Sequence, residues 1–378
     1  MTALIPADGR TSTRPLVIVN AGSSSLKVSV LRPDDTVAAA LELDRWDGSP
    51  DHPKVVAFLR AARDGAVAVA HRVVHGGRRF REATRIDDQV IAGISELTDL
   101  APLHQPRALA GIKAAQAALP GVPGVACFDT AFHAGLPEAA ATYALPRSWT
   151  DTFGVRRFGF HGLSHSYAAR RAGLLAGKDP GELRIVTCHL GAGASLAAVL
   201  RGKSVDTTMG FTPLEGLVMA TRSGSVDPGL LIWLQQHGQA SVSDLATVLE
   251  TESGLAGLSG HRGGDMRDIL VAAAADDQPA RLAVAVYLHR LRREIAAMAA
   301  AMDGLDVLVF TGGVGEHSPQ IRARAAAGLG FLGVTIDQTR NEATADADIS
   351  GPGPVRVLVI TAREDIEMAR QTRALLAP

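Results

Sequence analysis

Two segments about 170 residues apart share one pattern, and this pattern limits the possible folds more than any other feature. Each consists of an apolar strand, a turn rich in glycine and serine, and a Ser-Leu pair that opens an outgoing strand. The first turn and outgoing strand cover Gly22–Leu31 and the second cover Gly193–Leu200, so Ser25 and Ser195 differ by 195 − 25 = 170 positions. Since 170 residues is about the length of one domain, the pattern predicts two similar domains, each with a hairpin turn.

Short β-branched runs alternate with longer helical patterns along the rest of the chain, which predicts an α/β fold. Strands are expected at residues 16–20, 27–31, 68–74, 125–130, 184–190, 195–200, 306–312 and 355–360. Helices are expected at residues 88–100, 106–118, 164–176, 228–237, 242–250, 280–302 and 318–328, with Asp87 and Ser241 as N-caps. The alanine-rich segment 280–302 is interpreted as a packing helix rather than a dimer contact.

Length and charge support two domains and exclude bulk electrostatic binding. A chain of 378 residues exceeds one ordinary hydrophobic core. Its formal net charge of −1 predicts no general attraction to nucleic acid or anionic membranes, so placed groups must hold any bound anion. No apolar run reaches the roughly 18 residues of a membrane helix, and residues 1–14 do not resemble a signal peptide. Cys127 and Cys188 lie in apolar stretches and are expected to be buried thiols, as in a reducing cytoplasm.

Three glycine-containing turns could hold phosphate groups. In the opening turn, Asn20–Lys27, backbone N–H groups can converge on one point and serine hydroxyls add further donors. The P-loop spacing is absent, and an ordinary polar hairpin remains the alternative. His189–Ser195 offers a second turn. Thr311–His317 is predicted to be a glycine loop between an apolar strand and a helix that starts at Ser318-Pro319. Three such turns in an α/β chain predict a bound nucleotide.

Two carboxylates and two histidines are candidates for a metal site. Mg²⁺ prefers one or two carboxylates together with phosphate oxygens and water. Asp129 and Glu364 each follow an apolar strand, with a helix cap or surface charge as the alternative role. His161 and His165 have the i, i+4 spacing of a zinc pair but no third ligand nearby. An imidazole that faces phosphate is therefore favoured for His161, whereas His165 could as easily be a helix-start histidine bonded to its own turn.

Two arginines lie in segments where a charged side chain is unexpected without a partner. Arg72 is within an apolar strand, where an unpartnered charge is costly, and Arg222 is in a loop of small residues. The guanidinium fork matches carboxylate and phosphate groups, although a salt bridge is the alternative for both residues.

Several motifs resemble the signatures of the acetate kinase family. They are VIVNAGSSSLK, AHRVVHGG, LAPLHQP, FDTAFH, FGFHGLSH, DTTMGFTPLEGLVMATRSGSVDPG and FTGGVGEHSPQIR, in the usual order between residues 17 and 325, and ITAREDIEMAR resembles the family's last strand and helix. The family comprises kinases of short-chain carboxylic acids with the actin, Hsp70 and sugar kinase fold. The resemblance thus implies duplicated ribonuclease H-like domains, residues 1–134 plus 366–378 and residues 135–365, with the active site in the interdomain cleft. Most nucleotide contacts would lie in the second domain.

The resemblance also implies roles for individual positions. The catalytic residues would be Arg72, Asp129, His161 and Arg222. Arg72 would also bind the carboxylate, and the pocket for the methyl group would comprise Val74, Leu103, Phe160 and Pro213. The nucleotide would contact Asn20, Ser23, Ser25, Lys27, His189, Gly191, Gly193, Asp265, Met266, Arg267, Gly312, Gly313 and Gly315. Asn20 and Glu364 would serve Mg²⁺, with Mn²⁺ as an alternative ion.

Four positions depart from the family pattern. Ala192 replaces an asparagine in the second phosphate turn, which removes one amide donor. Gln105 replaces another asparagine, Met266 replaces an aromatic residue, and Arg363 replaces an asparagine before Glu364. None of these changes removes a proposed catalytic group.

The function implied by the resemblance is reversible, Mg²⁺-dependent transfer of the ATP γ-phosphoryl group to acetate, which gives acetyl phosphate and ADP. The expected partners are acetate and ATP, with no nucleic acid or membrane, and the protein is expected to be a cytoplasmic homodimer. A propionate or butyrate kinase, a nucleotide-driven clamp like Hsp70, and a family member that turns over slowly are the alternatives. Arg72 and the apolar pocket argue against the clamp, which needs no carboxylate site.

Overall fold

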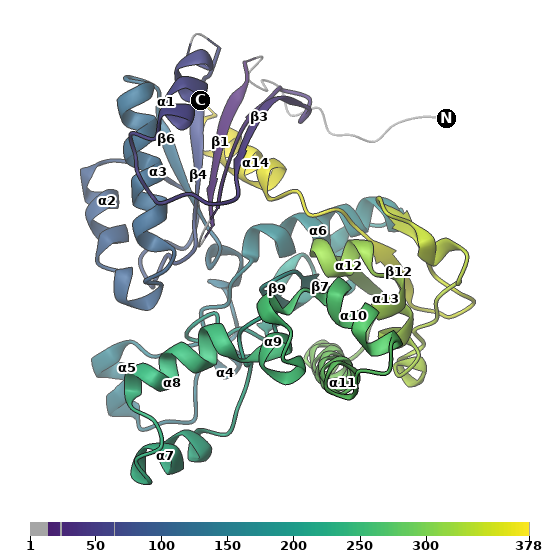
Figure 1. Cartoon of the computed structure of the whole chain (residues 1–378). Helices are drawn as coiled ribbons and strands as arrows, with labels where there is room; N and C mark the ends of the chain where they lie inside the picture. Colours follow the sequence, from purple (N-terminus) through teal and green to yellow (C-terminus); the bar gives the residue numbers. More distant parts are fainter. Residues whose placement is uncertain (1–13, 23–24, 64, 378) are drawn as a thin grey trace, which may run out of the picture. The chain divides into compact units, whose positions relative to one another are not determined.

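The computed structural model describes residues 14–22, 25–63 and 65–377 (Figure 1). Two compact units divide the chain. The first comprises Met1–Phe132 with Arg363–Pro378, and the second is the contiguous segment His133–Ala362.

A six-stranded mixed sheet forms the centre of the first unit. Its strand order is β3-β2-β1-β4-β6-β5. The strands are β1 (Leu16–Ala21), β2 (Leu26–Leu31), β3 (Val37–Leu43), β4 (Ala68–Val73), β5 (Thr84–Arg85) and β6 (Gly124–Phe128). Strands β1, β2 and β3 form an antiparallel meander, whereas β1, β4 and β6 run parallel and β5 pairs antiparallel with β6.

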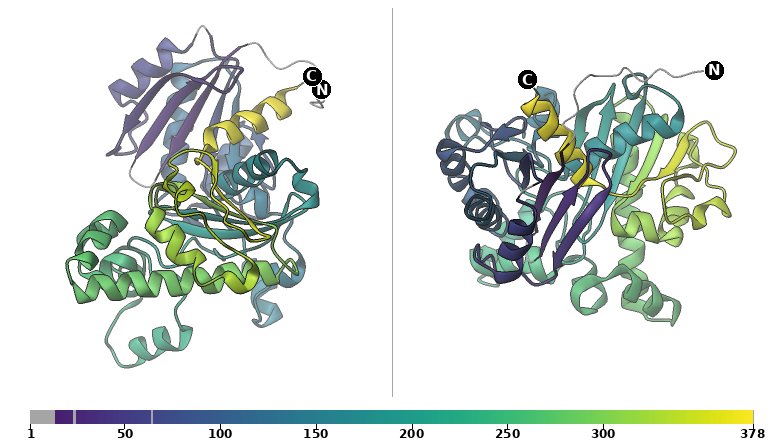
Figure 2. Two further views of the ribbon diagram at one scale, coloured as in Figure 1. Left: turned by 90° about the vertical axis from the view of Figure 1, so that its right-hand side faces the viewer. Right: turned by 90° about the horizontal axis from the view of Figure 1, so that it is seen from above.

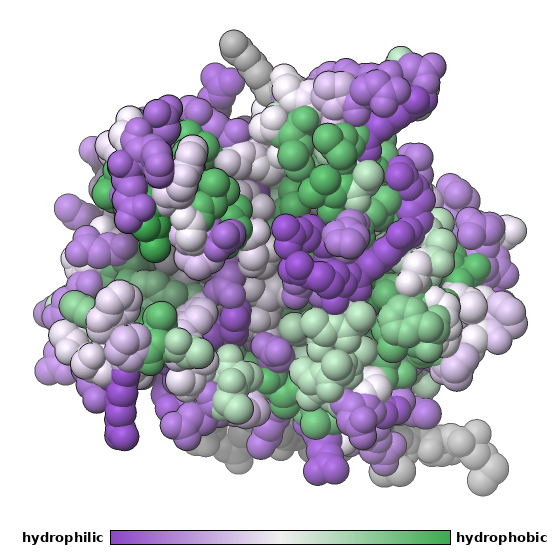
Figure 3. All heavy atoms as spheres, turned by 90° about the horizontal axis from the view of Figure 1, so that it is seen from below, coloured by the Kyte–Doolittle hydropathy of each residue, from purple (hydrophilic) through white to green (hydrophobic). Residues whose placement is uncertain are grey.

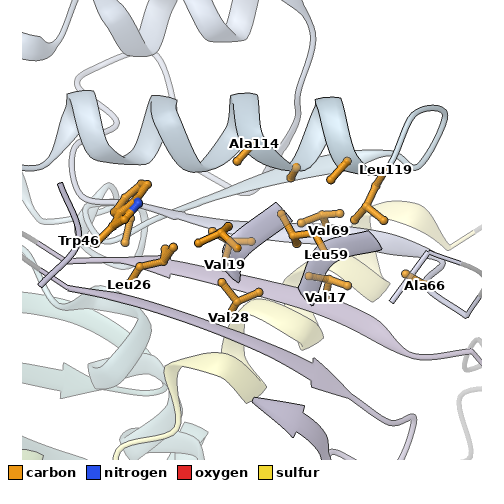
Figure 4. Packing of buried hydrophobic residues seen from close by; sticks show 14 residues of the cluster. Val17, Val19, Leu26, Val28, Trp46, Leu59, Ala66, Val69, Ala114 and Leu119 are labelled. Atoms are coloured by element: carbon orange, nitrogen blue, oxygen red, sulfur yellow. The ribbon is translucent and has the colours of Figure 1, made fainter. Parts of the chain in front are cut away.

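Helices cover both faces of this sheet. They are α1 (Pro53–Ala61), α2 (Asp88–Ser95), α3 (Gln105–Ala118) and α14 (Glu364–Leu376). Alternate strand residues, such as Val17 and Val19, point to the side of α1 and α3, as the two-residue period of a strand requires. Figure 4 shows this core beneath α3, with Trp46 at one end and Leu119 at the other. Helix α14 lies along the opposite face (Figures 1 and 4), where the Cys127 thiol is 3.8 Å from the Met368 carbonyl oxygen.

The second unit repeats the same sheet topology. Its strands are β7 (Arg184–Leu190), β8 (Ala194–Leu200), β9 (Lys203–Thr207), β10 (Val307–Thr311), β11 (Ala347–Asp348) and β12 (Arg356–Val359), in the order β11-β12-β10-β7-β8-β9. Here too a meander of three antiparallel strands continues into two parallel strands and a two-residue antiparallel edge. The predicted duplicated α/β fold is therefore confirmed.

The helices of the second unit are α4 (Glu138–Ala141), α5 (Arg147–Phe153), α6 (Gly162–Ala176), α7 (Pro228–Gln236), α8 (Val242–Thr247), α9 (Gly254–Ser259), α10 (Met266–Ala274), α11 (Gln278–Ala300), α12 (Gly312–His317) and α13 (Pro319–Ala326). Helix α11 is the long helix in both views of Figure 2 and buries a stripe that includes Val284, Leu288 and Leu291. The packing interpretation of this segment is confirmed. None of the helices that the structure describes is both long and apolar enough to cross a membrane.

The repeated hairpins differ by one residue. Asn20 pairs with Lys27 across β1 and β2, and His189 pairs with Ser195 across β7 and β8, so these positions correspond with an offset of 189 − 20 = 169. Ser25 precedes its strand whereas Ser195 lies within its strand. The sequence match of these two serines was therefore misaligned, because the second turn, residues 191–193, is one residue shorter than residues 22–25.

Most predicted elements are present, and one local prediction is wrong. The eight predicted strands are found, and Asp87 and Ser241 accept hydrogen bonds from Val90 N and Asp244 N as N-caps. The glycine loop expected at 311–316 is wrong, because helix α12 begins there directly after β10. Cys127 and Cys188 are buried as predicted, and burial raises the pKa of the Cys127 thiol to about 12.

Candidate active site

In the first unit, three polar side chains meet at the carboxyl ends of adjacent parallel strands. Asn20 is the penultimate residue of β1, Arg72 lies near the end of β4, and Asp129 directly follows β6, where its N–H donates to the Val73 carbonyl at 2.9 Å. Arg72 donates from Nη2 to Asp129 Oδ2 at 2.6 Å and from Nε to both carboxylate oxygens at 3.2 and 3.0 Å. Its Nη1 donates to Asn20 Oδ1 at 3.2 Å. The structure thus brings together three of the predicted site residues.

The Arg72–Asp129 pair is largely withdrawn from water. The Arg72 side chain is 18% exposed and the Asp129 side chain is 1% exposed. Burial opposes the charge on Arg72, but the adjacent Asp129, with a smaller contribution from Glu364, leaves the pKa of the guanidinium above its usual value. Glu364 is the first residue of α14 and is half-buried. Arg72 therefore stays charged, and part of its surface remains accessible.

The hairpin residues predicted to hold phosphate differ in their positions. Ser25 ends the turn, where its carbonyl accepts a hydrogen bond from Gly22 N at 2.8 Å. Lys27 lies on β2 opposite Asn20, and its exposed ammonium is 3.2 Å from Glu42 on β3. Ser23 lies outside the described residues. Lys27 has a carboxylate partner, so its predicted phosphate role would require that surface pair to open.

Two of the predicted methyl-pocket residues belong to the first unit. Val74 follows β4 and is buried, whereas Leu103 is 50% exposed just before α3. The neighbouring Gln105 is fully buried and its Nε2 donates to the carbonyl oxygens of His75 and Ile94, at 3.0 and 3.3 Å. This departure from the family pattern is thus a satisfied structural amide.

In the second unit, the glycine turn between β7 and β8 lies against two predicted catalytic residues. A Cβ atom added at Gly193 would be 2.7 Å from Arg222 Nη2 and 3.3 Å from His161 Nε2. Gly191 N donates to the Gly193 carbonyl at 3.0 Å, which closes the turn. A side chain at position 193 would fill the space that faces the guanidinium and the imidazole. Only glycine leaves that space open for a ligand.

The charge on Arg222 has no balancing carboxylate in the described part of the chain. Its Nη1 donates to the Pro213 carbonyl at 2.5 Å, and it forms no ion pair there. Burial lowers the pKa of this guanidinium, while the more distant Glu250 opposes that change. A half-buried cation that contacts only a neutral carbonyl is suited to an anionic ligand.

A brace that sequence reasoning missed holds the loop before Arg222. Arg157 donates from Nη1 to the carbonyl oxygens of residues 207, 208 and 209, at 3.2, 3.2 and 3.1 Å, and from Nη2 to Glu215 at 2.7 Å. Tyr143 donates to Glu215 at 2.5 Å and accepts from Phe211 N at 2.9 Å. The loop that carries Pro213 is therefore fixed at both ends. Nothing in the separate motifs indicated that these distant residues meet.

A pocket of about 560 Å³ lies beside the same glycine turn. Gly191 and Ala192 form one side, and Met266 contributes a buried apolar side chain to another. The remaining lining residues are Met219, Ala220, Leu255, Gly263, Gly264, Asp265, Arg267, Leu270, Tyr287, Gly313, Val314, His317 and Ser318. An apolar pocket that opens at a backbone turn has the form expected for the base and sugar of a nucleotide.

The predicted nucleotide contacts divide into those that line this pocket and those that support it. Gly313 has open space where a side chain would be, whereas Gly312 N donates to Glu316 Oε1 at 2.8 Å and Gly315 faces β10. Asp265 caps α10 and binds Arg267 Nη2 at 2.6 Å; this hydrogen bond lowers the pKa of the Asp265 carboxyl. Gly312 and Gly315 are therefore structural in this arrangement, and Gly313 can face a ligand.

The histidines of the FHGLSH motif do not form a zinc pair. His165 is fully buried and both ring nitrogens are engaged, with Thr187 Oγ1 at 2.7 Å and with Ser195 Oγ at 2.7 Å. The expectation that His165 bonds its own turn is therefore wrong. His161 caps α6 in the left-handed conformation, with its Nδ1 2.9 Å from Ser195 Oγ and its ring 4.4 Å from that of His189. Phe160, which precedes it, is buried.

The carboxylates of the first unit fit a magnesium ion that arrives with a nucleotide. No group of three or more acidic, histidine or cysteine side chains arranged for a metal occurs among residues 14–22, 25–63 and 65–377. Mg²⁺ needs fewer protein ligands than that when phosphate oxygens and water complete its shell. Asn20, Asp129 and Glu364 supply oxygen atoms of the required kind near Arg72.

The repeated sheet topology and the nucleotide-sized pocket define a class, the kinases with the actin, Hsp70 and sugar kinase fold. Comparison with known proteins narrows this class to one family. The sequence profile of the acetokinase family matches residues 55–370. An acetate kinase from Clavibacter michiganensis is 45% identical, over 96% of this chain and 99% of that protein. The chain belongs to the acetokinase family.

Two solved structures support the same assignment. A Porphyromonas gingivalis acetate kinase is 36% identical with a TM-score of 0.87, over 96% of this chain and 100% of that chain. A Francisella tularensis propionate kinase is 33% identical with a TM-score of 0.88, over 95% of this chain and 98% of that chain. The resemblance inferred from the motifs is confirmed.

Proposed function

We propose that this protein is an acetate kinase, which transfers the γ-phosphoryl group of ATP reversibly to acetate and forms acetyl phosphate and ADP. Arg222 is the observation that carries the proposal. It is a half-buried cation without a carboxylate partner in the described chain, placed beside a glycine turn and close to a nucleotide-sized pocket. The family supplies the acceptor, since relatives across the whole chain are acetate kinases.

The chemical difficulty is that one anion must approach another. A carboxylate oxygen attacks the γ-phosphorus in line, and the bond from that phosphorus to the β-bridging oxygen breaks. Arg222 and Arg72 offset the repulsion and then stabilise the charge on the equatorial oxygens. Acetate is already ionised near neutral pH, so no general base is needed. Asp129 holds Arg72 in place rather than abstracting a proton.

Magnesium is proposed to accompany the nucleotide, with Mn²⁺ as a possible substitute. Asn20, Asp129 and Glu364 are the residues proposed to hold it, directly or through water. When bound, the ion would neutralise phosphate charge during transfer. The nucleotide base and sugar are assigned to the pocket lined by Met266 and Gly313, so the second unit supplies most nucleotide contacts.

The residues proposed to contact the methyl group of the acceptor are Val74 and Leu103 of the first unit and Phe160 and Pro213 of the second. Leu103 is half exposed, so this residue does not by itself exclude a longer acid. One methylene group contributes only about 1–3 kcal/mol to discrimination. Propionate is therefore expected to be a poorer substrate rather than a rejected one. The similarity to a propionate kinase makes propionate kinase activity the alternative function to test.

We further propose that the protein is a cytoplasmic homodimer. Apolar side chains are exposed on α7 (Leu230, Ile232 and Trp233) and on α5 (Trp149 and Phe153). Figure 3 shows apolar patches among polar residues on the face seen from below, where α7 is nearest the viewer. A second copy of the chain would cover such patches. Sedimentation velocity should show a dimer, and Trp233→Asp should shift it to the monomer.

A hydroxylamine assay tests the reaction. Protein incubated with ATP, Mg²⁺ and millimolar acetate should accumulate acyl phosphate, and the product should depend on acetate. Relative kcat/KM values with acetate, propionate and butyrate then identify the preferred acid. Absence of acyl phosphate above the blank with all three acids would refute the proposal. ATP hydrolysis without any acyl phosphate would instead favour a nucleotide-driven clamp.

A further inference from the structure

Four side chains form a continuous line of hydrogen bonds in the second unit. Thr187 Oγ1 is 2.7 Å from His165 Nδ1, His165 Nε2 is 2.7 Å from Ser195 Oγ, and Ser195 Oγ is 2.9 Å from His161 Nδ1. His161 caps α6 and His165 lies four residues further along that helix, and the two hydroxyls lie on the paired strands β7 and β8. The line starts in the sheet and ends at His161, a proposed catalytic residue.

The inner part of this line is fully buried and uncharged. Thr187, His165 and Ser195 have no exposed surface. Burial lowers the pKa of His165 well below its usual value, and the neighbouring His133 and His189 lower it further. A neutral imidazole carries one ring proton, and each hydroxyl carries one proton. Each bond in the line therefore uses one proton. The buried Ser195 hydroxyl donates one proton, and its partners in the line are the two histidine nitrogens. When Ser195 donates to one of them, the direction of that bond fixes the direction of the others.

Two directions are consistent with this count. In the outward direction, Thr187 donates to His165 Nδ1, His165 Nε2–H donates to Ser195, and Ser195 donates to His161 Nδ1. In the inward direction, every one of these bonds reverses. The Thr187 proton must then find another acceptor, and among the described residues its further contact is the Ala197 carbonyl at 3.5 Å. That distance is too long for a good O–H···O bond, whereas 2.7 Å is the usual length.

We infer that Thr187, His165 and Ser195 are positioning residues that hold neutral His161 as the tautomer with its proton on Nε2. The outward direction leaves no buried proton without a near acceptor, and it makes His161 Nδ1 an acceptor. No proton is transferred along the line; each stays on its own atom. The inference concerns the tautomer, and its meaning for catalysis rests on the proposed function.

This tautomer presents a donor where an anion is expected. His161 Nε2 lies beside the Gly193 turn, which also faces Arg222. With a proton on Nε2, neutral His161 can donate a hydrogen bond to a phosphoryl oxygen without first becoming an imidazolium. The site would therefore keep this donor above the ordinary pKa of histidine, about 6.5.

Nitrogen NMR can read the tautomer directly. In full-length protein labelled with ¹⁵N-histidine, long-range ¹⁵N–¹H correlations at pH 8 should show His161 Nε2 as the protonated nitrogen and Nδ1 as the bare one. Loss of the His161 signals in His161→Gln assigns them. A proton on Nδ1 of His161 would overturn the inference. This measurement needs no turnover, so it remains valid even if acetate proves not to be the substrate.

The pH dependence of kcat gives a second, functional test. Ser195→Ala removes the donor to Nδ1, so nothing in the line holds His161 in the Nε2–H tautomer any longer. The fraction of His161 that takes the other tautomer offers Nε2–H only as an imidazolium. The charged and titratable groups that face these histidines include His133, His189 and Arg222. They are the same in the variant and the parent.

Relative to the parent enzyme, Ser195→Ala should lose about tenfold in kcat at pH 8.5 and less than about threefold at pH 6. Ser195→Thr, which keeps the hydroxyl, should restore the flat parental profile. Ser204→Ala is the matched control, because Ser204 bonds His133 Nδ1 at 2.7 Å and lies outside the line. It should leave the pH profile unchanged. An equal loss at every pH in Ser195→Ala would show a merely structural role and overturn the inference.

Discussion

Arg72 and Arg222 both carry a charge that is partly withdrawn from water, but different groups balance it. Arg72 is bound by a buried carboxylate and an amide oxygen, so its charge is satisfied before any ligand arrives. Arg222 contacts a carbonyl, and in the described chain no carboxylate pairs with it. Arg222 therefore depends more on a bound anion, and Arg72 is better fixed in direction.

Removal of the Arg222 guanidinium should reduce catalysis much more than folding. Arg222→Ala is expected to lower kcat for acetyl phosphate formation by about 10³-fold or more, because arginines that stabilise transferring phosphoryl groups contribute about 10³–10⁵. Arg222→Lys should recover only part of the rate, since an ammonium cannot provide the planar fork. Arg184→Ala, which breaks a half-exposed ion pair with Asp306, is the control and should keep the parental kcat. A normal rate in Arg222→Ala would remove Arg222 from the mechanism.

Loss of the Asp129 charge should destabilise the first unit. Asp129→Asn leaves Arg72 without its buried counterion, and the loss of one partner from such a pair costs about 3–5 kcal/mol. Urea unfolding followed by circular dichroism measures the change. Glu42→Gln breaks the exposed Lys27–Glu42 pair and should change stability by less than about 1 kcal/mol. Similar stabilities for the two variants would contradict the assignment of Asp129 as the structural partner of Arg72.

At the residue scale, the sequence identified the important side chains better than it predicted their partners. It indicated that Arg72 needs a counter-charge and that Asp129 ends an apolar strand, but their ion pair depends on which strands are adjacent. The partners of His165 were predicted wrongly for the same reason. Thr187 and Ser195 are 22 and 30 residues away, and only the pairing of β7 with β8 brings them to α6.

The segment between β9 and α7 has no regular secondary structure, but side-chain hydrogen bonds fix its position. Arg157, Glu215 and Tyr143 fix residues 207–215, and this segment supplies the Pro213 carbonyl that receives Arg222 Nη1. The sequence indicated only a loop of small residues around Arg222. The contacts show instead how a loop can orient a catalytic cation.

A weakened brace should reduce turnover without direct contact with substrate. Glu215→Gln removes the charge that Arg157 faces, and a displacement of about 1 Å at Arg222 can cost up to about 10²-fold in rate. We expect kcat to fall about tenfold, with a smaller change in the KM for ATP. Tyr143→Phe, which removes one hydrogen bond of the brace, should have a weaker effect in the same direction. Parental kcat in Glu215→Gln would show that the brace does not position Arg222.

Strands with strong apolar patterns were predictable, and the more exposed or polar strands were not. Strand β3 is rich in alanine and largely exposed, and β9 is short and polar, so neither carries the signal of a half-buried strand. Helix α12 begins with two glycines, which usually mark a turn. There Thr311 ends β10, and the Glu316 carboxylate accepts from Gly312 N, so the helix starts without a loop.

Across the whole molecule, three buried histidines link stability to pH. Burial lowers the pKa of His71 to about 3 and that of His133 to about 4, and lowers that of His165 well below normal. Because the unfolded chain binds these protons from about pH 6.5, it is favoured as the pH falls from about 6.5 toward 4. Above about pH 6.5 this contribution to stability is complete.

Urea unfolding at pH 7.5, 6.5 and 5.5 should therefore show a progressive loss of stability. Each buried histidine should contribute up to about 1.4 kcal/mol per pH unit below its unfolded pKa. His71→Leu should flatten the pH dependence of the stability of the first unit. It should cost little at pH 7.5 because His71 Nδ1 has no hydrogen-bond partner among the described residues. Stability that does not change between pH 7.5 and 5.5 would contradict the neutral state of these side chains.

The duplication was the most predictable feature of the whole molecule. The residue-by-residue alignment of the two hairpins could not be predicted. Equal sheet orders in the two units confirm the repeat that the glycine and serine turns suggested. The one-residue difference between the turns is invisible without strand pairing, because a short motif can be aligned in more than one way.

The position of α14 sets an order for folding during synthesis. This helix covers one face of the first sheet, yet it leaves the ribosome 376 − 128 = 248 residues after the end of β6. At about 5–20 residues per second, the amino-terminal strands must wait about 10–50 s for their last covering helix. The contiguous carboxyl-terminal unit has all its own elements by then. The part of the chain that emerges first is therefore the last to mature.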